Sequence, residues 1–263
     1  MREKIKTKKD LLHLCQKQKS DGKRDLVIYV LNNIDKCVKM IDTTWEMEGA
    51  EVDVQRSKRT RIEILQETLQ ATCNDSSCNW LQMAKETLSR NGVNLAEFSH
   101  AIKDALTNGR GKKRNIMIIG PANCGKTFIF QPLRNIYKSF VNSATGSFAW
   151  VGVEDAEIIY LNDFRWNEKI IQWQDFLRLL EGDSVHFPAP KTHYSKDILL
   201  TADTPIFATS IRAIRRYQNA NMAQEETKMM EVRWKIFHFH QQIPCEDMLD
   251  ATPCGKYFAR LIL

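Results

Sequence analysis

The sequence predicts an α/β fold with a mainly parallel sheet in three layers, preceded by a helical module. After residue 109, short apolar runs alternate with helical patterns, which is typical of buried parallel strands connected by helices. Before that residue, apolar side chains recur at helical spacing instead. We therefore divide the chain into a basic, partly helical N-terminal region (1–59), a helical module (60–109) and an α/β domain (110–263).

Helix patterns and end signals define the helical module. Apolar residues fit one helix face between Ile62 and Leu69 and a second between Trp80 and Leu88. Asn94 can cap a third helix, which Asn108-Gly109 ends. Each of these helices has an apolar face, so we expect the module to pack against a partner.

Strand patterns define the α/β domain. They cover residues 116–119, 158–161, 206–209 and 236–239, and a helix pattern covers 171–180. His238 and His240 also have the spacing of metal ligands in rolling-circle nicking nucleases. No nucleophilic tyrosine segment lies nearby, so we interpret the two histidines as part of an alternating strand.

The composition is that of a globular protein and is compatible with a polyanionic partner. Hydrophobic residues make up 43% of the chain and charged residues 27%, which excludes disordered, collagen-like and rod-shaped proteins. The 38 basic and 32 acidic residues give a net charge of +6, which suits binding to nucleic acid. The N-terminus is too polar for a secretion signal, and no apolar run approaches the roughly 18 residues of a spanning helix. We expect an intracellular, soluble protein without a membrane partner, in the nucleus or the cytoplasm.

The cysteines predict thiols rather than a disulfide framework. Seven are scattered along the chain, and an odd number in a reducing compartment is not expected to form structural disulfides. Cys73 and Cys78 are a close pair, but no second pair completes a set of zinc ligands. We therefore interpret them as ordinary thiols.

A phosphate-binding loop follows the first predicted strand. Its residues are Gly120, Pro121, Ala122, Asn123, Cys124, Gly125, Lys126 and Thr127, and they match the pattern G-x-x-x-x-G-K-[ST]. The glycines allow a turn whose amides point at phosphate oxygens, and the start of the following helix adds positive partial charge. Lys126 is expected to contact the β and γ phosphates, and the Thr127 hydroxyl to ligate Mg²⁺. The sequence therefore predicts a site for ATP and Mg²⁺, in which we interpret Cys124 as an inert loop position rather than a redox-sensitive thiol.

A second acidic position follows the strand 158–161. An NTPase needs a carboxylate there to hold Mg²⁺ and to orient the attacking water. Asn162 and Asp163 stand where two acids are expected. In one register Asp163 polarises the water and Asn162 is a neutral ligand of the metal shell. In the other, Asp163 alone holds the metal and the base is an acid within 154–157.

The region from Arg110 to about Ile243 resembles the superfamily 3 helicase domain of parvovirus nonstructural replication proteins and of Rep proteins from small circular single-stranded DNA viruses. The resemblance covers about half of the chain. It is carried by GPANCGKT, LNDFRW (161–166), PAPKTH (188–193), TPIFATS (204–210) and VRWKIFHF (232–239). It implies an AAA+-like P-loop NTPase domain, with residues 60–107 as oligomerisation helices.

The resemblance also implies roles for individual residues. Lys191 and His193 would lie on the hairpin that grips one DNA strand in the central pore of a hexamer. Ser210 would end the sensor strand, where the family usually has an asparagine that contacts the γ-phosphate or its water. Arg233 would be the arginine finger that reaches the ATP site of the neighbouring subunit. Asp163 would be the acid of the second strand, and a metal ligand with Thr127.

We therefore expect an ATP-dependent single-stranded-DNA translocase or helicase, a homo-oligomer with a hexameric ring, that acts in the replication of viral or virus-derived DNA. Asn162 and Ser210 depart from the family pattern and leave an alternative open. In that alternative the chain is a nucleotide-binding, catalytically weak, oligomerising DNA-binding remnant of such a protein. RNA in place of DNA is a third possibility, because no aromatic platform in the sequence decides between the two.

Overall fold

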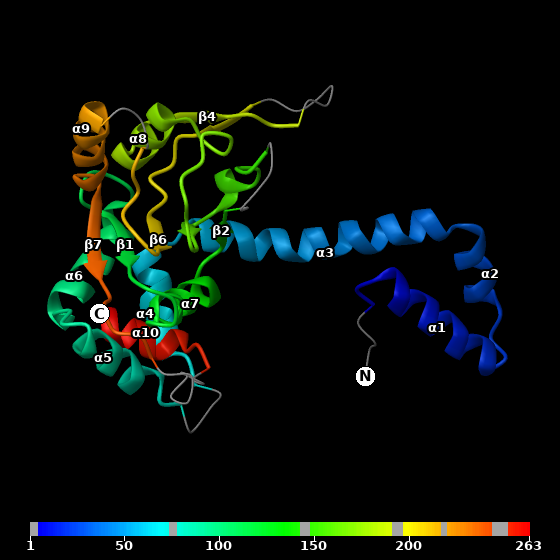
Figure 1. Cartoon of the computed structure of the whole chain (residues 1–263). Coiled ribbons are helices and arrows are strands. Elements are labelled where there is room, and N and C mark those ends of the chain that lie inside the picture. Colours follow the sequence, from blue (N-terminus) through cyan, green and yellow to red (C-terminus); the bar gives the residue numbers. More distant parts are fainter. Residues whose placement is uncertain (1–4, 74–77, 143–147, 191–196, 217–219, 244–251) are drawn as a thin grey trace. The chain divides into compact units, whose positions relative to one another are not determined.

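A computed structural model describes residues 5–73, 78–142, 148–190, 197–216, 220–243 and 252–263 (Figure 1). The chain divides into two compact units, Met1–Thr60 and Arg61–Leu263. No helix in the described part of the chain is long and apolar enough to cross a bilayer.

The N-terminal unit is helical. It consists of α1 (Lys8–Ser20), α2 (Asp25–Asn32) and α3 (Ile34–Ser57). Thr7 and Asp10 form a capping box that starts α1, because each side chain accepts a hydrogen bond from the other's backbone amide. Leu11, Cys15, Val30 and Cys37 form a small buried cluster. The described residues of this unit thus pack as helices around a small apolar cluster.

A parallel sheet is the centre of the second unit. Among the described residues its strands lie in the order β2-β3-β6-β1-β7, and every neighbouring pair is parallel. The strands are β1 (Asn115–Ile119), β2 (Ser139–Val141), β3 (Ile158–Leu161), β6 (Ile206–Ser210) and β7 (Trp234–His238). Ile119 at the end of β1 pairs with Ser210 of β6 and His238 of β7. The carboxyl ends of these strands therefore meet at one edge, where ligands bind in open α/β sheets.

The two faces of the sheet belong to two different hydrophobic clusters, because successive side chains of a strand point to opposite faces. Ile116 and Ile118 belong to one cluster, and Met117 and Ile119 to the other, as expected from the two-residue period of a strand. The first cluster also holds residues of α4 (Arg61–Gln70), α5 (Trp80–Arg90), α6 (Leu95–Asn108), α7 (Lys126–Ile136) and α10 (Gly255–Ile262). The second holds residues of α8 (Trp173–Glu181) and of the antiparallel pair β4 (Val185–Phe187) and β5 (Ile198–Leu200). The sheet thus lies between a helical layer on one face and a layer of α8 and the β4–β5 pair on the other.

The α/β fold with a parallel sheet and a preceding helical module is confirmed. The sequence missed the short edge strand β2 and the pair β4–β5, whose three-residue strands give almost no periodic signal. It also missed the single-turn helix η1 (Val153–Asp155) and the helix α9 (Ala220–Glu231). Helices α4–α6 share one buried cluster with the sheet. The predicted three-part division stays a prediction.

A buried arginine joins α8 to the strand pair β4–β5. Arg110 is 2% exposed, and burial lowers the pKa of its guanidinium. It donates to the carbonyl oxygens of Leu179 and Asp183 at 2.9 and 2.6 Å, and to those of Leu200 and Ala202 at 3.3 and 2.9 Å. These carbonyls lie at or just after the carboxyl ends of α8 and β5, where backbone oxygens lack partners within the helix or strand. The arginine therefore fixes both elements to the start of β1.

Candidate nucleotide-binding site

The predicted phosphate loop connects β1 to α7 at the carboxyl edge of the sheet. Gly125, directly before α7, has a left-handed backbone with a φ of 88°, which glycine adopts without strain. At Gly120 a Cβ atom would lie 2.2 Å from the carbonyl oxygen of Phe239. Both positions therefore require glycine, one for its conformation and the other for space.

The side chains of the loop fold onto its own backbone. Lys126 is 6% exposed, and its ammonium group donates to the carbonyl oxygens of Gly120 and Pro121 at 2.8 and 2.5 Å. The Cys124 thiol is 1% exposed and donates to the Pro121 carbonyl at 3.0 Å. Cys124 is thus buried within the loop, and its interpretation as an inert loop position stays a prediction.

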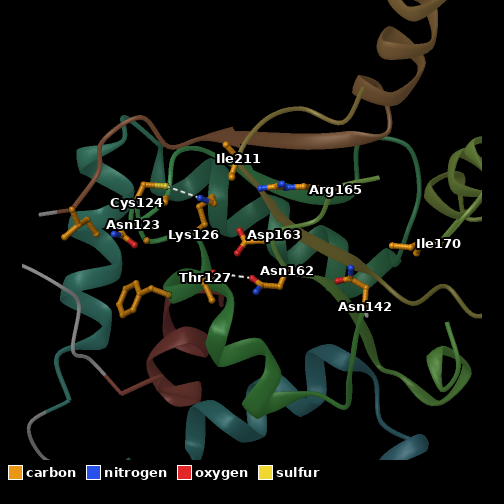
Figure 2. Close-up of a pocket in the computed structure, with 14 residues that line it drawn as sticks. Asn123, Cys124, Lys126, Thr127, Asn142, Asn162, Asp163, Arg165, Ile170 and Ile211 are labelled. Carbon is orange, nitrogen blue, oxygen red and sulfur yellow. Dashed lines mark hydrogen bonds between the residues drawn. The ribbon is translucent and has the colours of Figure 1, made fainter. Parts of the chain in front are cut away.

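A cavity of about 720 Å³ opens beside the loop. Figure 2 shows side chains from the loop and from the ends of neighbouring strands around it. Its lining consists of Ala122, Asn123, Cys124, Gly125, Lys126, Thr127, Phe128, Asn142, Asn162, Asp163, Arg165, Ile170, Ile211 and Ile243. The volume lies within the range of small-molecule and cofactor sites. The structure thus places most of the predicted loop, together with Asn162 and Asp163, around one cavity.

A hydrogen-bond network joins the loop to β3 and β6. The Asn162 side-chain oxygen accepts from the hydroxyl of Thr127 at 3.3 Å and from that of Thr209 at 3.1 Å (Figure 2 marks the first bond). The Tyr160 hydroxyl donates to the same oxygen at 3.0 Å. Burial is the main cause that raises the pKa of Tyr160 to about 12, so this hydroxyl keeps its proton near neutral pH. The network therefore fixes Asn162 beside the Thr127 hydroxyl.

Asp163 has an unusual backbone at the end of the same strand. Its φ of 46° is left-handed, which is uncommon for a residue other than glycine. The Asp163 amide donates to the Thr209 hydroxyl oxygen at 2.8 Å, and this bond helps to hold the conformation. Strained residues of this kind concentrate at functional sites. The turn brings the Asp163 carboxylate into the cavity lining, beside Lys126 in Figure 2.

The alternative acids of the second register lie before β3. Glu157 accepts a hydrogen bond from the Lys138 amide at 2.9 Å, at the amino ends of β2 and β3. Glu154 and Asp155 belong to η1, which also precedes β3. Because the phosphate loop follows the carboxyl end of a parallel strand, these acids lie toward the opposite edge of the sheet. Asp163 is the acid that lines the cavity among the described residues.

Ser210 is turned away from the cavity. Its hydroxyl lies 3.1 Å from the Phe164 carbonyl oxygen and 2.7 Å from that of Arg212, within donating distance of both. Its backbone oxygen accepts from the Gly120 amide at 3.1 Å and so fixes the start of the loop. The hydroxyl of this strand that contacts Asn162 belongs to Thr209. The sensor role of Ser210 stays a prediction, and the geometry offers Thr209 as a second candidate.

Arg233 lies at the amino end of β7, so the structure does not bring it to the phosphate loop of its own chain. It is 5% exposed, its guanidinium pairs with the Glu181 carboxylate at 2.6 Å, and it donates to the carbonyls of Leu177 and Met229. A hydrogen bond from Lys112 and then the charge of Arg233 lower the pKa of Glu181, against burial, which raises it. The finger role across a subunit interface stays a prediction.

The two predicted DNA-binding residues, Lys191 and His193, lie outside the described residues. In the sequence they fall between β4 and β5, which pair antiparallel. Their role stays a prediction.

Arg165 is a cavity residue that the sequence analysis did not single out. It is exposed and lines the cavity, and Figure 2 shows its side chain extending across the cavity above Asp163. Its position in the sequence, two residues after Asp163, was the signal that could have predicted a place in the site. Arg165 adds positive charge on the side of the cavity that faces Lys126.

The fold is that of a P-loop domain of the superfamily 3 helicase type. The family model described as parvovirus non-structural protein NS1 matches residues 55–257, and the chain belongs to that family. A comparison with curated proteins gives no match.

Solved structures of JCV helicase share the fold. An X-ray structure of that helicase is 16% identical with a TM-score of 0.51, over 94% of this chain and 73% of the other. A second JCV helicase structure, with a bound phenoxyphenyl acetamide, is 15% identical with a TM-score of 0.51, over 85% of this chain and 64% of the other. The chain therefore spans less than two thirds of that second helicase chain.

Proposed function

We propose that the Arg61–Leu263 unit is an ATP-driven translocase or helicase on single-stranded DNA, working as a hexameric homo-oligomer in the replication of viral or virus-derived DNA. The observation that carries the ATPase part is the network in which Asn162 joins Thr127 of the loop to Thr209 of the neighbouring strand. It unites the phosphate loop, β3 and β6 at the point where an NTPase holds its metal and its water. Family membership and the helicase fold support the translocase part.

The residues at this point fit a Mg²⁺ ion that accompanies ATP. Thr127 and Asn162 offer two oxygen atoms 3.3 Å apart, and the Asp163 carboxylate lies in the same cavity lining. Mg²⁺ prefers such oxygen ligands and keeps several of its waters. When bound, the ion would supply positive charge that offsets the negative charge developing during hydrolysis.

We infer that the first register holds, in which Asn162 belongs to the metal shell and Asp163 orients the attacking water. The side-chain oxygen of Asn162 lies 3.3 Å from the Thr127 hydroxyl oxygen, so both can face one ion, and the left-handed turn presents Asp163 to the cavity separately. Lys126 would move from its carbonyl partners to the phosphates when ATP is bound. Because a neutral amide attracts a cation less than a carboxylate does, we expect slow turnover.

The ATPase test compares purified full chains with and without oligo-dT. We expect DNA-stimulated hydrolysis that Lys126→Ala and Asp163→Asn abolish, whereas Lys169→Ala, at an exposed lysine outside the cavity lining, leaves it unchanged. Oligo-rU in place of oligo-dT decides between DNA and RNA. The molecular mass in solution, measured with and without nucleotide, tests whether the chain forms a hexamer. Absence of ATP binding with magnesium present would refute the proposal.

Arg233 can be tested as a finger by mixing two inactive chains. If it acts across an interface, Arg233→Ala chains supply intact loops and Lys126→Ala chains supply intact arginines, so the mixture regains activity. If Arg165, rather than Arg233, supplies the positive charge that stabilises the phosphates, and does so within its own chain, Arg165→Ala abolishes hydrolysis. Mixing Arg165→Ala with Lys126→Ala chains then restores nothing.

A second candidate is a nucleotide-binding, catalytically weak remnant that oligomerises and binds DNA. It is favoured by Asn162 in place of an acid and by the Ser210 hydroxyl, which contacts its own chain. Tight ATP binding with negligible turnover, even with oligo-dT, would identify this candidate.

A further inference from the structure

Cysteine thiols from distant parts of the chain converge beside the helical layer. Cys73 follows α4, Cys78 precedes α5, and Cys254 is the residue before α10. Their sulfur atoms all lie within 4.8 Å of one another. Those of Cys73 and Cys254, residues 181 positions apart, are separated by 3.6 Å. The fold thus supplies the third sulfur that the spacing of Cys73 and Cys78 alone does not offer.

These separations suit a metal ion. Zinc binds thiolate sulfur at about 2.3 Å, so a tetrahedral site holds its sulfur atoms about 3.8 Å apart. The Cys73–Cys254 separation of 3.6 Å is close to that value. No two of the three sulfur atoms are more than 4.8 Å apart, so the side chains need to move little to bind one ion. A disulfide needs sulfur atoms about 2.05 Å apart and would use only two of the thiols.

The surroundings favour a structural ion of the zinc type. The thiols pack at the apolar cluster formed by α4, α5, α6, α7 and α10, where Cys254 is 9% exposed and Cys73 and Cys78 are partly buried. Sulfur donors select zinc over Mg²⁺ and Ca²⁺, so such a site would not compete for the ion of the nucleotide. Among the described residues no other group of three histidine, cysteine or acidic side chains converges in this way.

We propose that Cys73, Cys78 and Cys254 bind one zinc ion that links the residue after α4 and the residue before α5 to the start of α10. Three thiolates leave one tetrahedral position for water or another ligand. Trp80 stands two residues after Cys78, and its ring centroid lies 5.9 Å from that of Phe258 in α10 and 5.6 Å from that of Phe128 in α7. The ion therefore stabilises the aromatic packing behind the phosphate loop. Phe128 directly follows Thr127 of the loop.

Metal analysis of the full chain, purified with reductant, tests the proposal. We expect about one zinc per chain, and after exchange with cobalt(II) the charge-transfer absorption of cobalt–thiolate bonds. Cys73→Ser, Cys78→Ser and Cys254→Ser should each lower the zinc content by at least tenfold. Cys15→Ser and Cys37→Ser are matched controls, because both cysteines are buried in the other unit, and they should keep the zinc.

A second measurement needs no substitution and so does not depend on whether the variants fold. Bound zinc should protect Cys73, Cys78 and Cys254 from alkylation, as mapped by mass spectrometry, while a strong chelator exposes them and lowers the melting temperature. Zinc should restore both properties, and magnesium should restore neither. A folded, reduced chain that takes up neither zinc nor cobalt overturns the proposal. So does a Cys73–Cys254 disulfide that persists in the purified chain with no metal uptake after reduction.

Discussion

Replacing Arg233 by alanine should destabilise the Arg61–Leu263 unit, whatever it does to hydrolysis. The arginine side chain is 7% exposed and pairs with Glu181, and its other hydrogen bonds go to backbone carbonyls of α8 and α9. Removing one partner of a buried ion pair costs about 3–5 kcal/mol. The Glu181 side chain is 25% exposed and keeps its bond to Lys112, so the cost here should fall to about 2–3 kcal/mol.

Urea unfolding followed by circular dichroism measures this cost. With a urea dependence of about 1–3 kcal/mol per molar, a loss of about 2–3 kcal/mol should lower the midpoint by about 0.7–3 M. Arg165→Ala is the matched control, because Arg165 is exposed in the cavity and its loss should change stability by less than about 0.5 kcal/mol. If Arg233→Ala unfolds at the wild-type midpoint and only the ATPase activity is lost, Arg233 is free to act between subunits and the buried ion pair is not its main role.

Other substitutions give separate tests. Asn162→Asp should raise the turnover number several-fold in a steady-state ATPase assay, because a carboxylate beside Thr127 holds the metal more strongly; an unchanged rate would contradict the inferred register. Gly120→Ala should weaken binding of a fluorescent ATP analogue at least tenfold, because the new Cβ would collide with a backbone carbonyl. Gly49→Ala is the control: a Cβ atom at Gly49 has no neighbour within 4 Å, so the affinity of this variant for the ATP analogue should match that of the wild type. The Arg61 hydrogen bond lowers the pKa of Asp203, whose side chain is 62% exposed, so Asp203→Asn should cost up to about 1 kcal/mol at pH 7. This difference should disappear as pH falls below about 4 and through the lowered pKa, in unfolding experiments at several pH values.

The phosphate loop could be predicted from the sequence because its determinants are local. The strand, the glycines, Lys126 and the helix that follows lie within one short stretch of chain, and the carboxyl ends of parallel strands meet at one edge. The acid of β3 was predictable for the same reason. The turn that follows fixed which of Asn162 and Asp163 contacts Thr127, and spacing alone does not determine a left-handed turn.

Long-range packing decided what the sequence could not show. Thr209 and Ser210 are neighbours in β6, so they point to opposite faces, and only the assembled sheet determines which hydroxyl contacts Asn162. The partner of Arg233 is Glu181, which lies 52 positions earlier. Cys254 likewise meets Cys73 only because α10 packs against α4. Such contacts have no signature in a single sequence.

The position of β1 in the middle of the sheet bears on how the chain is made. Residues 115–119 pair with residues 206–210 on one side and 234–238 on the other, so this apolar strand has no partner until some 90 more residues have been synthesised. At roughly 5–20 residues per second, that interval is about 5–20 s. During it the emerging polypeptide exposes a hydrophobic segment to aggregation and to chaperones. Translation that stops before β6 would therefore yield a fragment whose phosphate loop has no sheet to support it.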